Sequence, residues 1–243
     1  DRAGALTVGV EEETMLLDPV TLDLAPRAAA VLARLADDLR FTSELPAAQL
    51  EIATAPAASA VDAVAQLAAA RRELARAAVG IARPAVAGMH PFAAPDGALS
   101  GGPRYDRLAA EYGPIARRQL VASLQVHVAV GGAERSLAVY NALRSYLPEL
   151  AALAANAPLA GGADSGLASV RPTVCGLLPR QGVPPALASW EQLADELRWG
   201  AATGALPSAS TWWWELRPHP AFGTLELRVP DAHRRRGARS PAR

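Results

Sequence analysis

Three adjacent glutamates, Glu11, Glu12 and Glu13, follow an apolar, strand-like run in the segment TVGVEEETMLLD at residues 7–18. Side chains alternate along a strand, so Glu11 and Glu13 share one face, about 7 Å apart, while Glu12 points to the other, apolar face. Two carboxylates this close raise each other's pKa unless positive charge compensates them. The pattern therefore predicts a cation over Glu11 and Glu13.

Three further segments repeat this separation of apolar and polar residues. The latter part of 41–54, residues 120–130 and residues 224–229 each show the period-two alternation of a half-buried strand. Their polar faces would present Gln49 and Glu51, then Gln125 and His127, and finally Glu226 and Arg228.

An antiparallel sheet covered by helices on one side leaves one face free for such groups. Here that face would collect at least four glutamates and one histidine, a donor set that suits Mg²⁺ or Mn²⁺. For the glutamate triplet alone, an ordinary solvated strand face is about as good an interpretation. Agreement among four strands favours the metal site.

Helices and turns must position these strands. Apolar residues at helical spacing predict helices over 27–40, 60–83 and 133–154, and Ser189 is expected to begin another. Residues 156–185 form a long segment rich in glycine and proline, and loops of this length in compact domains tend to carry function. Strands and helices mixed in this way predict an α+β fold.

The composition limits the classes of function. The 243 residues, 51% of them hydrophobic, suffice for one sizeable core, and we expect a single domain over residues 1–231. All 24 basic residues are arginine and they balance 24 acidic residues, so no net field recruits nucleic acid or a membrane surface. Small-molecule or protein partners are expected. The lack of lysine excludes a Gly-Lys-Ser/Thr phosphate loop.

Other features bear on location and on the end of the chain. Cys175 is the single cysteine, which argues against disulfides and a thiolate zinc site and favours a reducing, cytoplasmic setting. The longest apolar windows, such as 147–159, are interrupted and too short to span a membrane. Residues 232–243 are rich in arginine and are expected to form a disordered tail.

Some conspicuous residues are expected to pack rather than react. His90, beside a proline, is expected to be a structural hydrogen-bonding group, and His219 and His233 are expected at the surface. Of the tryptophans in the run 212–214, alternate members are expected in the core.

Eight short motifs occur in order along nearly the whole chain. They are GVEEE at 9–13, ELPAAQLE at 44–51, GMHPF at 88–92, RY at 104–105, QVHV at 125–128, ANAP at 155–158, SVRP at 169–172 and RPHPAFGTLELRVPD at 217–231. Together they resemble the carboxylate-amine ligase family, whose members are often described as type 2 glutamate-cysteine ligases. The resemblance implies a glutamine-synthetase-like fold, with an antiparallel sheet forming an open funnel and helices packed on its outer face.

The resemblance also implies an activity. ATP, with Mg²⁺ or Mn²⁺, would phosphorylate a substrate carboxylate, and an amine would then displace the phosphate. For the named activity L-glutamate and L-cysteine give γ-glutamylcysteine, a step of glutathione biosynthesis. A homodimer is compatible with this interpretation. Family members continue past Asp231 with further C-terminal helices, so this chain is expected to lack them and to be weakly active.

The resemblance assigns metal binding to five residues of the sheet. Glu11 and Glu13 would be paired metal ligands, and the set would be completed by Glu51, His127 and Glu226.

It assigns substrate contacts to four more residues. Arg228 would bind phosphoryl oxygens and, with Gln125, would contact ATP. Arg171 would bind a substrate carboxylate, and Glu44 would join a metal or the incoming amine.

Two other hypotheses stay open. A non-catalytic module that holds Mg-ATP would follow if turnover needs the missing C-terminal segment. A metal-dependent hydrolase would use the same glutamates and histidine, although zinc sites usually employ more than one histidine.

Overall fold

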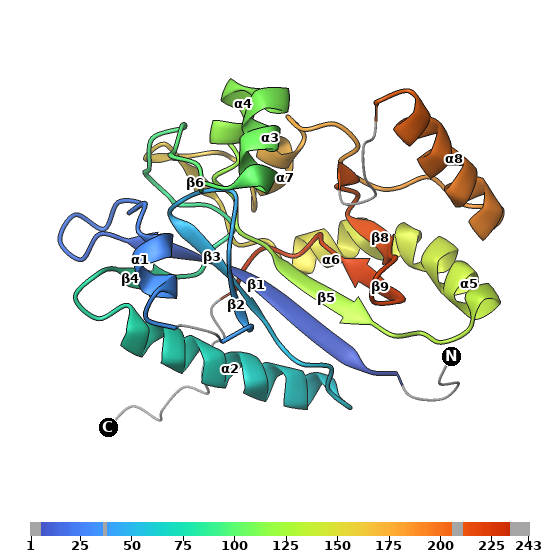
Figure 1. Cartoon of the computed structure of the whole chain (residues 1–243), viewed down its shortest axis with the longest axis horizontal. Helices are drawn as coiled ribbons and strands as arrows, with labels where there is room; N and C mark the ends of the chain where they lie inside the picture. The colour runs from blue at the N-terminus through green and yellow to red at the C-terminus, as the bar shows by residue number, and fades with distance from the viewer. Residues whose placement is uncertain (1–5, 36–37, 206–210, 234–243) are drawn as a thin grey trace.

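The computed structural model describes residues 6–35, 38–205 and 211–233. Figure 1 shows its strands and helices in chain colours. In this part of the chain seven strands form one sheet in which every pairing is antiparallel, in the order β2-β3-β1-β5-β9-β8, with β4 also paired to β1. The strands are β1 Val8–Leu17, β2 Phe41–Ser43, β3 Gln49–Ala53, β4 Arg83–Ala85, β5 Leu124–Val128, β8 Leu216–His219 and β9 Thr224–Leu227, while β6 Leu159–Ala160 and β7 Ala163–Asp164 form a separate hairpin.

The helices are mostly short and lie between the strands in sequence. They are α1 Ala28–Leu32, α2 Ala60–Ala77, α3 Pro103–Tyr112, α4 Pro114–Arg117, α5 Ala133–Leu143, the 3₁₀ turn η1 Arg144–Tyr146, α6 Leu147–Leu153, α7 Arg171–Cys175 and α8 Trp190–Ala202. No helix in the described ranges combines the length and apolar character needed to cross a bilayer.

The long helix α2 covers one face of the N-terminal strands. Ser59 begins it by accepting a hydrogen bond from the backbone N–H of Asp62 at 3.1 Å, as the sequence predicts for a Ser/Thr cap. The apolar stripe of α2 includes Leu67 and Leu74, which pack with Leu50 and Ile52 of the sheet in one core. The buried side of the sheet is therefore fixed by the alternation within β3.

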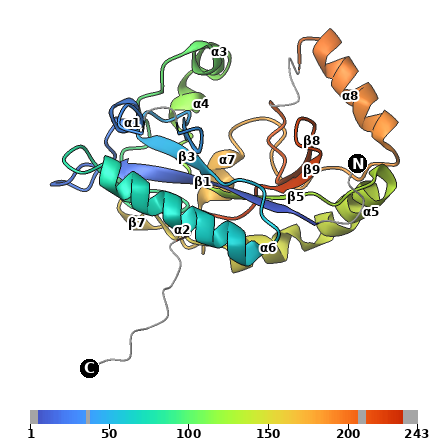
Figure 2. The ribbon, with the colours of Figure 1, turned by 60° about the horizontal axis from the view of Figure 1, so that its bottom comes forward.

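A second core lies under the C-terminal strands. Tyr140 of α5 and Leu147 of α6 are fully buried and pack with Leu216 and Leu225 of β8 and β9. Figure 2 shows α2, α5 and α6 on one side of the sheet, with α3 and α4 at one end and α8 at the other end of the opposite side. Helices thus border the second face as well as covering the first, and leave its centre accessible.

The predicted antiparallel sheet is confirmed; its funnel shape stays a prediction. The helix predicted over 27–40 is wrong for the described residues beyond α1, where the backbone N–H of Leu35 donates to the carbonyl of Leu32 in an i to i+3 bond; residues 36–37 lie outside the described residues. The alternation of the tryptophans at 212–214 would suit a strand, but the strand β8 begins only at Leu216.

The structure covers only the first residues of the predicted tail, 232–243. The greater part of the predicted tail, 234–243, lies outside the described residues. Ala232 and His233 are packed against the domain instead: Ala232 is fully buried, and the backbone carbonyl of His233 accepts a hydrogen bond from Arg71 at 2.7 Å.

Candidate functional site

The register of the sheet places the predicted polar side chains on one face. Glu13 lies opposite Glu51 across β1 and β3, and His127 lies opposite Glu226 across β5 and β9. Directly paired residues of an antiparallel ladder project to the same side. Glu11 joins them because it is two residues from Glu13 on β1.

A cavity of about 520 Å³ lies over this face. Its walls come from the sheet and from α3, α7 and the segments before β3 and β8. It is lined by acidic residues Glu11, Glu13, Glu44, Glu51 and Glu215, basic residues Arg104, Arg171, Arg217 and Arg228, polar or aromatic residues including Gln125, Tyr105, Tyr112, Trp213 and His219, and Cys175.

Three carboxylates form the first group of interest, which we call the acidic triad. Glu13, Glu44 and Glu51 each offer an oxygen within 4.8 Å of the other two. Burial, followed by the charge of Glu13, raises the pKa of Glu44 to about 7. Burial and then the charges of Glu44 and Glu11 raise the pKa of Glu51 well above its usual range. The triad is therefore short of positive charge.

The second group, the histidine triad, contains Glu11, His127 and Glu226, again with ligand atoms within 4.8 Å. The Nδ1 atom of buried His127 lies 3.0 Å from the hydroxyl of Thr224, which fixes the ring. Its Nε2 atom is buried without a hydrogen-bond partner in the described residues and lies 3.4 Å from Glu11 Oε1. An imidazole held at one nitrogen and free at the other is typical of a metal ligand.

Two arginines surround the carboxylate of Glu226. Arg217 Nε donates to Glu226 Oε2 at 2.5 Å, and Arg228 Nη1 donates to Oε1. Burial alone would raise the pKa of Glu226, but the charges of Arg228 and Arg217 hold it at about 2. Glu226 is ionised and already compensated, unlike the acidic triad.

Gln125 connects the arginines with the acidic triad. Its Oε1 accepts a hydrogen bond from Arg228 Nη1 at 2.6 Å, and its Nε2 donates to Glu13 Oε1 at 3.2 Å. Glu13 Oε2 accepts a further bond from the backbone N–H of Ser123 at 2.6 Å. Gln125 thus holds the carboxylate of Glu13 and the guanidinium of Arg228 at fixed positions relative to each other.

Arg171 lines the cavity but is committed to the protein backbone. Its Nη1 donates to the carbonyl of Val229 and its Nη2 to the carbonyl of Arg228, both at 3.0 Å. Only its buried Nε lacks a hydrogen-bond partner among the described residues. Each terminal nitrogen therefore has an N–H engaged by the backbone, and the binding of a substrate carboxylate that the resemblance implied for Arg171 stays a prediction.

Arg217 and Thr224 belong to the site and were not predicted from the sequence. Both follow from the β8–β9 hairpin, whose register places Arg217 opposite Glu226. The turn-like residues Pro220 to Gly223 between two strand-like runs were the available signal.

Of the other histidines, His90 has a structural role and His219 lies at the cavity. His90 is structural, as expected: its Nδ1 accepts the N–H of Ala93 at 2.9 Å, and its Nε2 lies 2.8 Å from the carbonyl of Leu22. The surface placement of His219 is wrong, because its ring lines the cavity, stacks on Phe222 and lies 5.4 Å from that of His127.

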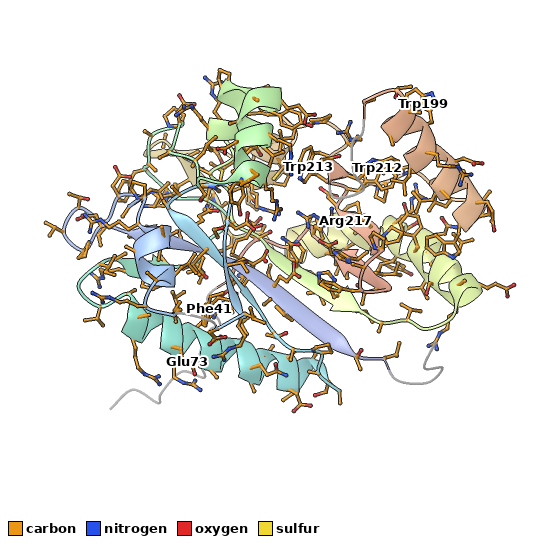
Figure 3. All side chains as sticks on the ribbon, viewed as in Figure 1. Phe41, Glu73, Trp199, Trp212, Trp213 and Arg217 are labelled. Atoms are coloured by element: carbon orange, nitrogen blue, oxygen red, sulfur yellow. The ribbon has the colours of Figure 1, made fainter. Side chains whose placement is uncertain are left out.

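Two of the three tryptophans at 212–214 are buried, and the third lines the cavity. Trp212 and Trp214 are buried, as expected, and pack against Leu193 and Leu197 of α8. Trp213 lines the cavity and contacts the ring of Tyr112 edge-to-face, at 5.5 Å between centroids. Figure 3 shows Trp213 on the side of the run nearer α3, with Arg217 below it.

The donor chemistry fits a hard divalent cation best at the acidic triad. Burial and neighbouring carboxylates raise the pKa of Glu44 and of Glu51, and no arginine of the described residues is hydrogen-bonded to the three carboxylates of the triad. Oxygen ligands are what Mg²⁺ and Mn²⁺ prefer. The histidine triad offers the free Nε2 of His127, but the arginines compete for its Glu226 oxygens. The site as a whole can hold cations beside two fixed guanidinium groups.

Comparison with known proteins places the chain in a family. The profile of glutamate-cysteine ligase family 2 matches residues 7–240. A Rubrobacter xylanophilus protein provisionally named glutamate-cysteine ligase 2-3 is 42% identical over 231 residues, covering 93% of this chain and 64% of that protein. A Paracoccus denitrificans protein provisionally named glutamate-cysteine ligase 2 is 40% identical over 235 residues, covering 93% and 61%. The chain thus spans less than two thirds of these relatives.

Solved structures share the fold at low sequence identity. A bifunctional glutathione synthetase from Pasteurella multocida superposes with a TM-score of 0.68 at 16% identity, over 93% of this chain and 36% of that one. A glutamate-cysteine ligase from Francisella tularensis, solved with AMP, gives 0.60 at 14% identity, over 93% and 61%. With the profile match over nearly its whole length, the chain belongs to glutamate-cysteine ligase family 2.

Proposed function

We propose that this chain carries the catalytic site of an ATP-dependent carboxylate-amine ligase that joins L-glutamate to L-cysteine. One observation carries the proposal: the acidic triad lines a single cavity together with Arg217 and Arg228, whose guanidinium groups are held by an ionised Glu226. Family membership and the AMP bound in the Francisella tularensis ligase agree with it.

The proposed reaction has two steps. An oxygen of the glutamate side-chain carboxylate attacks the γ-phosphorus of ATP, and ADP leaves. The amine nitrogen of cysteine, after losing a proton, then attacks the acyl carbon and expels phosphate. The products are γ-glutamylcysteine, ADP and phosphate.

Arg217 and Arg228 would bind the transferred phosphoryl group. Phosphoryl transfer depends on positioning and charge stabilisation rather than on covalent help from the protein. Glu226 and Gln125 orient the guanidinium of Arg228 before substrate arrives, so little reorganisation is needed. The proposed chemistry needs no lysine, and the chain contains none.

Glu13, Glu44 and Glu51 would hold a divalent cation, with Glu11 and His127 as candidates for a second. A bound Mg²⁺ or Mn²⁺ supplies charge neutralisation for the triphosphate. Glu44 also remains a candidate contact for the incoming amine, because it lies at the cavity wall beside Tyr105 and Arg104. A cytoplasmic location and a homodimer belong to the same proposal.

The test is turnover with defined substrates. We would incubate the protein with ATP, Mg²⁺, L-glutamate and L-cysteine, and measure phosphate release together with γ-glutamylcysteine by mass spectrometry. The matched variant Arg228→Gln should lose about 100-fold or more in rate, on the scale of removing one charge-stabilising donor. Arg118→Gln, whose ion pair with Asp96 is half exposed and outside the cavity lining, serves as control.

Other outcomes separate the alternatives. Binding of Mg-ATP without phosphate release for any pair of amino acids would support a non-catalytic nucleotide-binding module. Hydrolysis of an amide without ATP would support the hydrolase. Phosphate release with glutamate and an amine other than cysteine would support a ligase whose amine substrate is not cysteine.

A further inference from the structure

Three sequence motifs meet in one cluster with the end of a fourth. Gly88, Asn156 and Arg171 come from GMHPF, ANAP and SVRP, and Asp231 ends the last motif. The carboxylate of Asp231 accepts the N–H of Asn156 at 2.6 Å and lies 3.6 Å from Arg171 Nη1. We call these four residues the Asp231 cluster.

The cluster is closely packed around the carboxylate. Asp231 is 2% exposed and Arg171 is 8% exposed. The N–H of Gly88 donates to the carbonyl of Asn156 at 3.2 Å, and a Cβ at Gly88 would lie 2.5 Å from the carboxyl carbon of Asp231. Glycine is therefore required there by close approach, and the cluster has one defined arrangement.

The cluster acts on the segment that carries Arg228. Strand β9 ends at Leu227, so the following carbonyls, of Arg228 and Val229, lie beyond its ladder. Arg171 donates one terminal nitrogen to each of them. A planar guanidinium can span two consecutive carbonyls in a way that a single ammonium cannot.

Arg228 is consequently fixed at both ends. Arg171 holds its backbone, and Glu226 and Gln125 hold its guanidinium. Removing Arg171 would free two buried carbonyls and leave Asp231 without its cation, which should let the backbone at Arg228 move.

We infer that Arg171 is a positioning residue that aims Arg228 into the cavity, with Asp231 as the anchor of its charge. This inference rests on the proposed function for the role of Arg228 at the phosphoryl group. The backbone contacts give Arg171 a different task from direct binding of a substrate carboxylate.

The first test needs no substrate. The ¹⁵Nε–Hε resonance of Arg228, assigned through its loss in Arg228→Gln, should shift or broaden in Arg171→Gln. It should stay in place in Arg144→Gln, which removes a half-buried arginine donor from the carbonyl of Pro184, away from the cavity lining. An unchanged Arg228 resonance in Arg171→Gln would overturn the inference.

The second test measures binding of Mg²⁺ with a non-hydrolysable ATP analogue by calorimetry. Arg228→Gln should weaken binding about tenfold or more, on the scale of one charged hydrogen bond. Arg171→Gln should reproduce most of that loss, and the double variant should add little to it. Equal and additive losses, or a raised KM for glutamate with unchanged nucleotide affinity, would refute positioning.

One further variant and one comparison keep the test decisive. Arg171→Lys retains the charge beside Asp231 but cannot span both carbonyls, so it should fold and still show the Arg228 shift; a wild-type spectrum would contradict the inference. If the shift occurs while Arg228→Gln binds the analogue normally, positioning stands and the proposed phosphoryl role of Arg228 fails.

Discussion

Glu13 and Glu51 lie directly opposite each other on the neighbouring strands β1 and β3, with Glu44 reaching the same point from the segment before β3. Like charges opposed across an antiparallel pair destabilise a sheet. Burial, followed by repulsion from the neighbouring carboxylates, raises the pKa values of Glu44 and Glu51. A bound divalent cation would neutralise these carboxylates, so the arrangement that destabilises the metal-free sheet would then form a cation-binding site.

Removing one carboxylate of the acidic triad should stabilise the metal-free protein. Glu51→Gln relieves a repulsion of about 1 kcal/mol, and its midpoint in EDTA should rise by about 2–4 °C. The added stabilisation by Mn²⁺ should shrink. Thermal melts with and without Mn²⁺ measure both effects, with Glu149→Gln on the exposed side of α6 as control. A lower midpoint in EDTA with an unchanged Mn²⁺ effect would contradict the prediction.

The metal-free protein should become less stable as pH rises from 5 to 8. The pKa of Glu44 is about 7 in the folded protein and about 4.3 when unfolded. The stability associated with its proton is fully present below the unfolded value and lost as pH passes through the folded one. The raised pKa of Glu51 acts in the same direction, while Glu226, with a pKa of about 2, stays ionised throughout.

Urea unfolding in EDTA at each pH measures this dependence. Glu44→Gln should flatten the curve, and saturating Mn²⁺ should do the same in the unaltered protein. A slope of the opposite sign, or one that survives both changes, would show that other groups dominate.

Thr224→Val should weaken cation binding at the histidine triad. It removes the hydroxyl that holds Nδ1 of His127, and loss of such a partner typically costs about 10-fold or more in metal affinity. Mn²⁺ titration followed by electron paramagnetic resonance provides the measurement. Thr224→Ser keeps the hydroxyl and should bind normally; equal affinities for the valine and serine variants would rule out this role.

Arg71→Leu should destabilise the fold without altering nucleotide binding. Glu12 is fully buried on the α2 side of the sheet, and Arg71 is its ion-pair partner. Leaving such a charge unpaired costs about 3–5 kcal/mol. Chemical unfolding should show this loss, while Arg72→Leu, an exposed neighbour, should change little. Similar stability for the two variants would mean that Glu12 finds another partner.

The period-two alternation was sufficient to predict which residues share a face. Glu11, Glu13, Glu51, His127 and Glu226 all project to the cavity side because each strand also carries an apolar set that must be buried. Ser59 as the start of α2 was equally readable, because capping is a local interaction.

The sequence does not predict that these residues form two separate triads, because their grouping depends on the register of each strand against its neighbours. The sequence predicts Glu226 as a metal ligand but does not predict its pairing with Arg217. The register of the β8–β9 hairpin, which pairs the two residues, cannot be deduced from either strand alone. The contacts of Arg171 depend on two carbonyls 57 and 58 residues away. Long-range register and backbone partners are what the local pattern leaves undetermined.

Anomalous diffraction from crystals grown with Mn²⁺ and a non-hydrolysable ATP analogue tests the central claim most directly. We predict a manganese peak coordinated by Glu13, Glu44 and Glu51, with the analogue's phosphates toward Arg217 and Arg228. Manganese bound only elsewhere, with the acidic triad empty at saturating concentration, would contradict the assignment of these carboxylates as cation ligands.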